Sequence, residues 1–519
     1  MRILIFHGYL LRGTGSNVYN ARLAAALARR GAVVDLLSQE RRARELDFVD
    51  AVGTWVGGEA RVDVVREPVR VTAWRPDIGD LLPTYVADRY EGVVAKLFAD
   101  CTDEEIAAYV AANVEAVRDV AARARPDVAL ANHLVMGPLV LARGLGDAVP
   151  YAAKIHGSAL EYTVKRDPAR FLPAAREGLE RARTVLVGSR HTAESLWAAM
   201  DDDGLPARTR LGPPGVDIAE FRPRPRGEAA AAVTALATRL AGTDSVAEDH
   251  AFARDEAAAG SALQRLDLAS GRDRHVAFVG KLIVSKGIDL LAAAWPLVLR
   301  DVACARLVVV GFGAFRAALE DLLAAFAVGD LDRVRAIAAE GRALEGGPRA
   351  PLRHLLAFLD SLSGEEAEAY RAAAAALGDR VVLTGRLEHD ELAPLLAACE
   401  AQVVPSTFPE AFGMVAAEAA ACGALPVSAA HSGLAEVTAP LAAAVPAEAR
   451  PWLSFPVGDG AVRDLASRIV AWLRAPEDIR AATRDALVSV ARERYSWEGV
   501  AAGVIAAAEG RRDELPEPV

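Results

Sequence analysis

The stretch AQVVPSTFPEAFGMVAAEAAACGALPVSA, residues 401–429, contains one complete unit of the fold that we predict for this chain. It begins with a short valine-containing apolar run, passes through a proline-containing loop, continues in strong helix formers that stop at Gly423, and ends in a second apolar run. Two strands joined through a helix in this way lie parallel in one sheet. The stretch therefore predicts an α/β fold.

The same alternation of short apolar runs and longer helical patterns occurs along most of the chain. A Pro- and Gly-rich segment, residues 212–227, separates two such series and predicts a domain boundary. In the first series the expected strands are RILIF (2–6), AVVDLLS (32–38), DVALANH (127–133), YAAKIHG (151–157) and TVLVGS (184–189). In the second they are HVAFVG (275–280), ARLVVVG (305–311), RVVLTG (380–385), AQVVPS (401–406) and ALPVSA (424–429).

Two nucleotide-binding-like halves are the domain organisation that these series favour. Two segments rich in Ala, Arg and Glu interrupt the pattern and are helical by composition. We expect an N-terminal domain at 1–220, a linker with a helical insertion at 221–272, a C-terminal domain at 273–475 with a helical insertion at about 317–377, and C-terminal helices at 476–519.

The composition is that of a globular protein of more than one domain. The chain has 519 residues, 52% of them hydrophobic and 25% charged, with a net charge of −11 from 59 basic and 70 acidic residues. An acidic chain is a poor candidate for non-specific binding of nucleic acid. We expect a cytoplasmic protein for three reasons. The four cysteines are scattered and lack metal-ligand spacing, no signal-peptide pattern follows Met1, and no 18 apolar residues are consecutive.

Ligands of open parallel sheets bind beyond the carboxyl ends of the strands, so the loops that follow the strands are the candidate sites. Gly13 and Gly15 follow the first strand and precede a helix, where backbone N–H groups could face an anion. Asp35 stands twenty residues after Gly15, as a ribose-binding carboxylate of a dinucleotide site would. Against that alternative, the glycines begin about seven residues after the strand, and the third glycine position holds Val18.

Two further loops carry cations or a histidine. His156 follows the strand at 151–157, where it could act in catalysis or serve only the structure. Lys281 and Lys286 lie between a strand and a helix, together with two glycines, an arrangement that suits a phosphate or diphosphate. The alternative for the lysines is a pair of solvated surface side chains.

The loop and helix at 406–423 contain two carboxylates in otherwise apolar surroundings. Glu410 should lie near the helix N-terminus and Glu418 about two turns further on. A carboxylate in an apolar helix is costly unless it has a partner, and the hydroxyls of a sugar or ribose are suitable partners. The N–H groups of Phe412, Gly413 and Met414 would face an anion at the first helical turn.

At this point the chain resembles the GT-B-fold glycosyltransferases of the large retaining family 4, over nearly everything except the two insertions. The motifs that carry the resemblance are GTGSNVYNARLAAALARRGAVVDLL, KIHGSALEY, VGSRHTAESL, PPGVDIAEF, FVGKLIVSKGIDLLAAA, VVVGFG, LTGRLEHDELAPLLAACE and, most specific, PEAFGMVAAEAAACGALPVSAAHSGLAEV. It implies two Rossmann-like domains facing each other across a cleft, and a C-terminal helix that crosses back to the first domain.

The resemblance also implies roles for single residues. Glu410 would contact the donor sugar near the reacting centre, and Glu418 would hold the ribose hydroxyls. The family more often has Arg where this chain has Lys281, which replaces a forked donor by a point charge. Lys281 and Lys286 would bind the diphosphate, and Gly15 would lie against the phosphates. His156 would lie beside the transferred sugar, and Arg386 and Leu387 near the base.

The implied activity is that of a hexosyltransferase-type enzyme that takes a sugar from UDP-, GDP- or ADP-sugar with retention of configuration. No Asp-x-Asp stands at a strand end, so we expect no required metal and no cofactor. A nucleotide-sugar epimerase of the same fold and an inactive sugar-nucleotide-binding module stay open as alternatives. The acceptor would be a small molecule, a glycan or a lipid-linked compound.

A local excess of positive charge bears on the acceptor. Residues 163–190 contain seven Lys or Arg and three Asp or Glu, an excess of four positive charges. This segment could attract an anionic acceptor or the inner face of a membrane, or it could be a solvated helix face.

Overall fold

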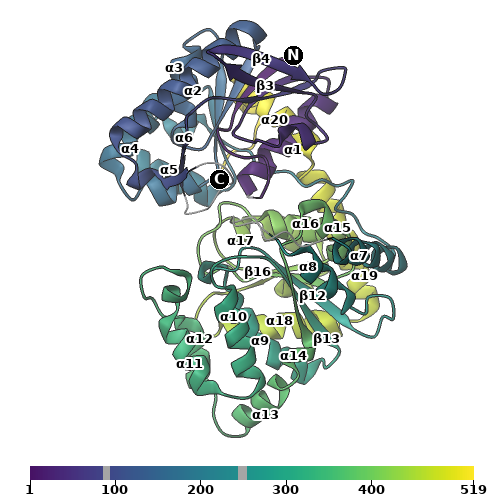
Figure 1. Ribbon diagram of the computed structural model, residues 1–519. Helices are drawn as coiled ribbons and strands as arrows, with labels where there is room; N and C mark the ends of the chain where they lie inside the picture. The colour runs from purple at the N-terminus through teal and green to yellow at the C-terminus, as the bar shows by residue number, and fades with distance from the viewer. Residues whose placement is uncertain (14, 86–93, 244–253, 519) are drawn as a thin grey trace. The chain divides into compact units, whose positions relative to one another are not determined.

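The computed structural model describes residues 1–13, 15–85, 94–243 and 254–518, which form two compact units (Figure 1). Among these residues, unit 1 contains those of Met1–Gly215 and Tyr495–Val519, and unit 2 contains those of Val216–Arg494. Each unit has its own sheet of mostly parallel strands, covered by helices. The predicted α/β class is therefore confirmed.

Unit 1 is built on a nine-stranded sheet in the order β11-β10-β9-β8-β1-β2-β5-β3-β4, in which the β3–β4 pair is antiparallel and every other pair is parallel. The five predicted strands are β1 (Arg2–Phe6), β2 (Val33–Leu37), β8 (Val128–Asn132), β9 (Tyr151–Ile155) and β10 (Thr184–Val187). Four strands of this sheet were not predicted: β3 (Ala51–Val56), β4 (Glu59–Val64), β5 (Val71–Arg75) and β11 (Thr209–Leu211). Two more unpredicted strands, β6 (Leu81–Thr84) and β7 (Val94–Leu97), form a small sheet of their own.

Alternate side chains of the unit 1 strands enter two separate cores, as the period of a strand requires. Ile3 and Ile5 of β1 pack in the core beneath α1 (Gly15–Arg29) and α20 (Trp497–Glu509). Leu4 and Phe6 pack in the core on the opposite face. The helices over that second core are α2 (Asp103–Ala124), α3 (Gly137–Leu145), α4 (Pro168–Glu180), α5 (Arg190–Met200) and α6 (Leu205–Arg208).

Unit 2 contains a six-stranded, all-parallel sheet in the order β14-β13-β12-β15-β16-β17. Its strands are β12 (Arg274–Val279), β13 (Ala305–Val310), β14 (Val381–Gly385), β15 (Ala401–Val404), β16 (Leu425–Ala429) and β17 (Ser454–Phe455). The first five were predicted. The connections include α9 (Ile288–Asp301), α15 (His389–Ala397), α16 (Met414–Cys422), α17 (Ser432–Ala444) and α18 (Ala461–Arg474).

The quoted stretch 401–429 is the predicted strand–helix–strand unit, β15–α16–β16. From Ala416 onward, α16 is buried, because it packs on β15 and β16 and on α15, α17 and α19 (Glu477–Arg494). The helix is almost entirely apolar because other strands and helices surround it on all sides.

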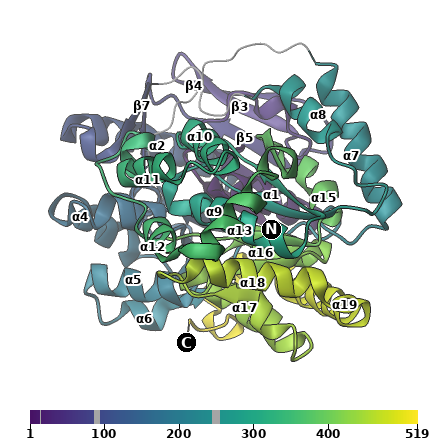
Figure 2. The same ribbon diagram turned by 90° about the horizontal axis from the view of Figure 1, so that it is seen from below.

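Both predicted insertions are helical and belong to unit 2. The first contains α7 (Arg226–Ala241) and α8 (Glu256–Gln264), which lie side by side (Figures 1 and 2). The second contains α10 (Arg316–Ala327), α11 (Leu331–Glu340), α12 (Arg353–Ser361) and α13 (Gly364–Ala374), followed by α14 (Leu377–Arg380).

The C-terminal segment differs from the expectation that all of residues 476–519 pack back on the first domain. α19 stays with unit 2, where Arg484 Nη2 pairs with the buried Glu400 Oε2 at 2.8 Å. Only from Tyr495 does the chain belong to unit 1, where α20 packs on α1. Likewise the first crossing between units lies after Gly215, five residues before the expected boundary. In the part of the chain that is described, none of the helices is both long and apolar enough to cross a membrane.

Candidate active site

Glu410 and Lys286, 124 residues apart in the sequence, form an ion pair in unit 2. Lys286 ends a single helical turn, Val284–Lys286, between β12 and α9, and Glu410 lies in the loop between β15 and α16. The Ser406 hydroxyl also donates to Glu410, and the Glu410 N–H donates to Ser432 Oγ at 2.9 Å. Burial raises the pKa of Glu410, but Lys286 and Ser406 outweigh it, so that the pKa lies below its ordinary value.

The N-termini of α9, α16 and α17 meet around this loop. Gly287, which precedes α9, has a φ of +67°, and an added Cβ would lie 1.9 Å from the Pro405 carbonyl oxygen. A Cβ on Gly433, at the start of α17, would lie 2.6 Å from Phe412 Cα. Only glycine allows these approaches. Three positive helix ends and the Lys286 ammonium therefore surround the loop, an arrangement that favours an anion.

Of Phe412, Gly413 and Met414, all predicted in the first turn of α16, only Met414 lies in the helix, and the other two residues directly precede it. Met414 is the first helical residue and Gly413 its N-cap, and all three residues are half-buried. The first N–H groups of a helix have no acceptor within the helix. They are therefore suited to contact an anionic ligand.

Glu418 lies inside α16 with a side chain only 3% exposed, and its partner is His389. His389 Nε2 lies 2.7 Å from Glu418 Oε1, and its ring centroid is 4.8 Å from that of the buried Phe221. The sequence indicates that Glu418 needs a partner but does not identify His389. Both residues are therefore held in place from neighbouring helices, α15 and α16.

The loops after β12, β13 and β14 carry the other predicted residues of unit 2. A Cβ on Gly311 would lie 2.0 Å from the Gly280 carbonyl oxygen, so the loops after β12 and β13 are in backbone contact. Lys281 is half-buried in the first of these loops. The Arg386 guanidinium lies 5.8 Å from the ring centroid of Phe312 and pairs with Glu388 at 2.8 Å, while Leu387 is buried.

His156 in unit 1 follows β9, as predicted, and a hydrogen-bond network fixes its tautomer. His156 Nε2 lies 2.8 Å from Asn132 Oδ1, and Asn132 Nδ2 donates to the Phe6 carbonyl at 3.1 Å. A rotated Asn132 amide would place oxygen against oxygen, so Oδ1 is the acceptor and His156 Nε2 carries the proton. His156 Nδ1 is then unprotonated and can accept a hydrogen bond from a hydroxyl.

The network continues to His7, another residue that the sequence does not predict for the site. His7 Nε2 contacts the Leu10 carbonyl at 3.0 Å, so it is protonated, and His7 Nδ1 accepts from Asn20 Nδ2 at 3.0 Å. The His156 ring centroid is 4.9 Å from that of the buried His133. Burial, followed by the nearby His133 and Lys154, holds the pKa of His156 well below its ordinary value, so the ring is neutral.

The remaining predicted positions of unit 1 are Gly15 and Asp35. Gly15 is the first residue of α1, and residue 14 lies outside the described residues. Asp35 lies within β2, fully buried, and accepts from Arg2 Nε and Trp74 Nε1, each at 2.8 Å. Its carboxylate is therefore engaged within the sheet, which contradicts the dinucleotide alternative.

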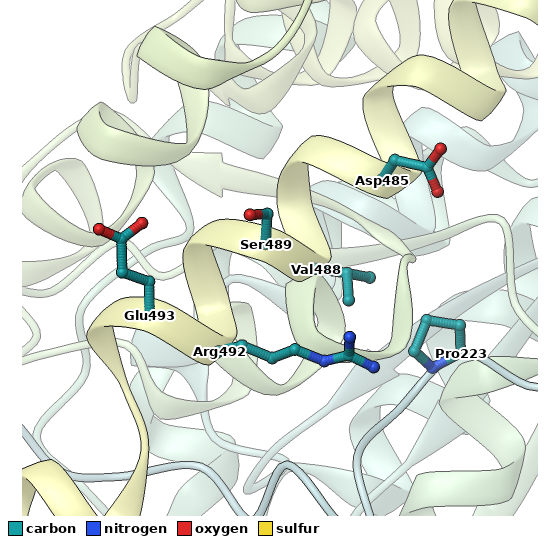
Figure 3. A pocket seen from close by; sticks show the side chains of 6 residues that line it. All are labelled: Pro223, Asp485, Val488, Ser489, Arg492 and Glu493. Atoms are coloured by element: carbon teal, nitrogen blue, oxygen red, sulfur yellow. The ribbon is translucent and has the colours of Figure 1, made fainter.

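An open depression of about 520 Å³ lies elsewhere on unit 2. Figure 3 shows its lining, which is Pro223 of the linker and Asp485, Val488, Ser489, Arg492 and Glu493 of α19. None of these residues belongs to the predicted site. Among the described residues, no three His, Cys, Asp or Glu side chains gather as a metal site would require.

Comparison with known proteins agrees with the class that these residues indicate. Residues 355–450, which include Glu410, Glu418 and His389, match the family model described as "Glycosyl transferases group 1". No curated protein matches the chain.

Several solved structures are similar over nearly the whole length. A sucrose-phosphate synthase from Thermosynechococcus elongatus has 19% identity and a TM-score of 0.55, with 99% of each chain covered. HepE from Anabaena, in complex with UDP and glucose, has 17% identity and a TM-score of 0.54, with 98% of this chain and 99% of that one covered. The catalytic domain of starch synthase IV from Arabidopsis thaliana, bound to ADP and acarbose, has 12% identity and a TM-score of 0.56, with 98% of each covered.

At these identities the solved structures establish the fold, which is GT-B. They confirm the predicted fold. The chain therefore has the GT-B fold, and residues 355–450 match the group 1 glycosyltransferase model.

Proposed function

We propose that this protein transfers a hexose from a nucleoside-diphosphate sugar to an acceptor hydroxyl, with retention of the anomeric configuration. The observation that carries the proposal is the arrangement around the 405–418 stretch of unit 2. There Lys286 and three helix N-termini surround one loop, and a buried carboxylate, Glu418, follows two turns later. These groups suit a diphosphate and a ribose, respectively.

Each predicted residue takes a role in this proposal. Glu418 accepts hydrogen bonds from the ribose hydroxyls, and Glu410 contacts the transferred sugar near the anomeric carbon. His156, through its unprotonated Nδ1, accepts from a hydroxyl of the same sugar. The diphosphate is bound by Lys281, Lys286 and the N–H groups of Phe412, Gly413 and Met414. Gly15 lies against the phosphates, and Arg386 and Leu387 contact the base.

The chemistry follows from the change in charge. The bond between the anomeric carbon and the diphosphate oxygen breaks, the sugar becomes oxocarbenium-like, and the leaving diphosphate gains negative charge. Fixed cations and helix N-termini directed at that diphosphate lower the barrier, and no metal or cofactor is needed for this. The acceptor oxygen then bonds to the same face of the sugar, and its proton passes to the leaving phosphate.

The donor and the acceptor are proposed only by class. HepE was solved with UDP and glucose and starch synthase IV with ADP, which supports a UDP- or ADP-sugar donor, with GDP-sugar as the third candidate. The acceptor is a small molecule, a glycan or a lipid-linked compound in the cytoplasm, and only the last would bring the protein to the inner face of the membrane. Four basic side chains of the 163–190 segment are paired with carboxylates, which weakens the case for such a contact: Lys165, Arg170, Arg181 and Arg190.

One experiment tests the proposal and separates it from the alternatives. The protein is incubated with a panel of UDP-, GDP- and ADP-sugars, and the free nucleoside diphosphate and free sugar are measured. We expect slow hydrolysis of one donor, with release of the sugar in the configuration of the donor. A new nucleotide sugar without hydrolysis would indicate an epimerase, and binding without any turnover would indicate an inactive module.

A further inference from the structure

The first helical insertion packs against the segment that carries the predicted base-binding residues. α7 lies on α15, and α8 lies on β14. β14 ends at Gly385 and α15 begins at His389, so these two contacts flank the short loop of Arg386, Leu387 and Glu388. The insertion is therefore placed to influence that loop.

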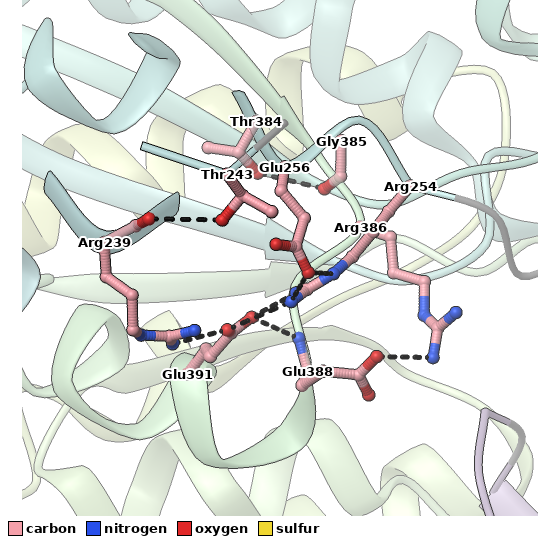
Figure 4. Close-up of polar contacts among 9 residues, drawn as sticks. All are labelled: Arg239, Thr243, Arg254, Glu256, Thr384, Gly385, Arg386, Glu388 and Glu391. Carbon is pink, nitrogen blue, oxygen red and sulfur yellow. Dashed lines mark hydrogen bonds and ion pairs between the residues drawn. The ribbon is translucent and has the colours of Figure 1, made fainter. Parts of the chain in front are cut away.

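Two arginines of the insertion segment bind one buried carboxylate of α15 (Figure 4). Arg239 Nη2 of α7 lies 2.7 Å from Glu391 Oε1, and Arg254 Nη1 lies 2.6 Å from Glu391 Oε2. The side chain of Glu391 is only 4% exposed and that of Arg254 only 14%. Burial raises the pKa of Glu391, but Arg254, the Glu388 N–H and Arg239 outweigh it and keep the carboxylate ionised.

The same carboxylate fixes the start of α15. Glu391 Oε2 accepts from the backbone N–H of Glu388 at 2.8 Å, and the two glutamates form a reciprocal capping box. Glu388 in turn pairs with Arg386 through Oε1 at 2.8 Å, as Figure 4 shows. One continuous set of polar contacts thus leads from α7 and Arg254 to Arg386.

The other side of the same loop reaches the predicted ribose site. His389, the residue after Glu388, contacts Glu418 at 2.7 Å. A shift at the start of α15 would therefore displace Arg386 and Leu387 on one side and the partner of Glu418 on the other. Lys286 and Glu410 lie on loops other than 386–388, where they pair with each other and Glu410 also accepts from Ser406.

We propose that the α7–α8 insertion is a positioning element for the nucleoside half of the donor, with Arg239 and Arg254 as the positioning residues. The Arg254–Glu391 pair is buried on both sides, whereas the Arg239 side chain is 58% exposed. A buried ion pair contributes little net stability compared with an apolar contact of the same shape, but it holds one geometry, because each charge needs its partner. Here the geometry that it holds is that of the base and ribose loop. This inference rests on the proposed function of that loop.

The test compares nucleoside diphosphates with inorganic pyrophosphate, which shares with them only the diphosphate. Calorimetry measures the dissociation constants of UDP, ADP, GDP and inorganic pyrophosphate for the wild type and for the double variant Arg239→Ala/Arg254→Ala. We expect the double variant to bind the preferred nucleoside diphosphate at least tenfold more weakly, whereas its pyrophosphate affinity stays within twofold. A loss of thermal stability with unchanged nucleoside diphosphate affinity, or an equal loss for both ligands, would overturn the proposal.

Three control variants keep the result interpretable. Arg272→Ala removes an exposed arginine, 82% accessible and paired with Asp267 in the same segment, and should change neither affinity. Lys286→Ala should weaken both ligands. Should the double variant not fold, Glu391→Gln keeps the shape of the site but halves its acceptors, and it should show the same selective loss. If the wild type binds pyrophosphate but none of the nucleoside diphosphates, the proposed function itself fails, a result distinct from failure of the positioning role.

Discussion

Glu418→Gln is the substitution that most directly tests the proposed ribose site. Glu418 is buried in α16, and one of its oxygens, Oε1, accepts from His389 Nε2 at 2.7 Å. Glutamine has nearly the same shape and can keep this hydrogen bond through its single oxygen. What the substitution removes is the negative charge and the second acceptor, Oε2, which becomes an NH₂ group.

The magnitude follows from this count of acceptors. A ribose hydroxyl that donates to the freed carboxylate oxygen would meet an amide donor in the variant, so one hydrogen bond to a charged acceptor is lost. Such bonds contribute about 1.5–3 kcal/mol. The expected dissociation constant for the nucleoside diphosphate is therefore roughly 10- to 160-fold higher, since about 1.4 kcal/mol corresponds to a factor of ten.

The assay is calorimetric titration of wild type and Glu418→Gln with UDP, ADP and GDP, with pyrophosphate as the ligand that lacks ribose. Thermal unfolding of both proteins controls for the fold. Pyrophosphate affinity should be unchanged in the variant. Equal affinities of the two proteins for the preferred nucleoside diphosphate would refute the assignment of Glu418 to the ribose.

Three further predictions concern turnover, metal and pH. His156→Ala and Glu410→Ala should lower donor turnover far more than donor affinity. Lys286→Ala should lower both, because the diphosphate is charged before and during the reaction. Near wild-type turnover of His156→Ala would show that this histidine is structural. Turnover should survive EDTA, and a complete loss that Mg²⁺ or Mn²⁺ restores would contradict the lysine-based account. Burial lowers the pKa of Lys154 from 10.5 to about 7. Between these two pH values, Lys154 is protonated in the unfolded chain but not in the folded protein. The free energy of unfolding should therefore rise with pH in this range, by up to about 1.4 kcal/mol per pH unit. Urea unfolding of Lys154→Met at several pH values should lack this part of the slope.

The strands that the sequence predicted share one property, which is burial on both faces of a parallel sheet. In β1, for example, the residues from Ile3 to Phe6 form a continuous apolar run, because helices cover both faces of the sheet. β4, at the edge of its sheet, has the sequence EARVDV and is exposed over most of its length, so it has no apolar run to recognise. Edge position and not weak pairing explains why it was missed.

A residue of the candidate site could be predicted from the sequence where its chemistry requires a binding partner. A carboxylate in an apolar helix requires a partner, so Glu418 could be singled out from the sequence. The identity of that partner, His389, depends on how α15 packs beside α16, which local sequence does not encode. The same holds for Asn132 and His156, which approach only because β8 and β9 are neighbours in the sheet.

Glu410 and Glu418 are held in different ways, and the difference fits the two roles proposed for them. Glu418 is almost fully buried and bonded to a histidine, so it is a fixed acceptor for a part of the donor that does not react. Glu410 is about a quarter exposed and paired with a flexible lysine, the same cation that is proposed to bind the diphosphate. A diphosphate that competes for Lys286 would release the Glu410 carboxylate toward the sugar hydroxyls. Lys286 would then exchange its ion pair with Glu410 for one with the diphosphate, which couples binding of the leaving group to positioning of the sugar. The observed donor affinity would therefore measure the difference in free energy between these two ion pairs, not the strength of either.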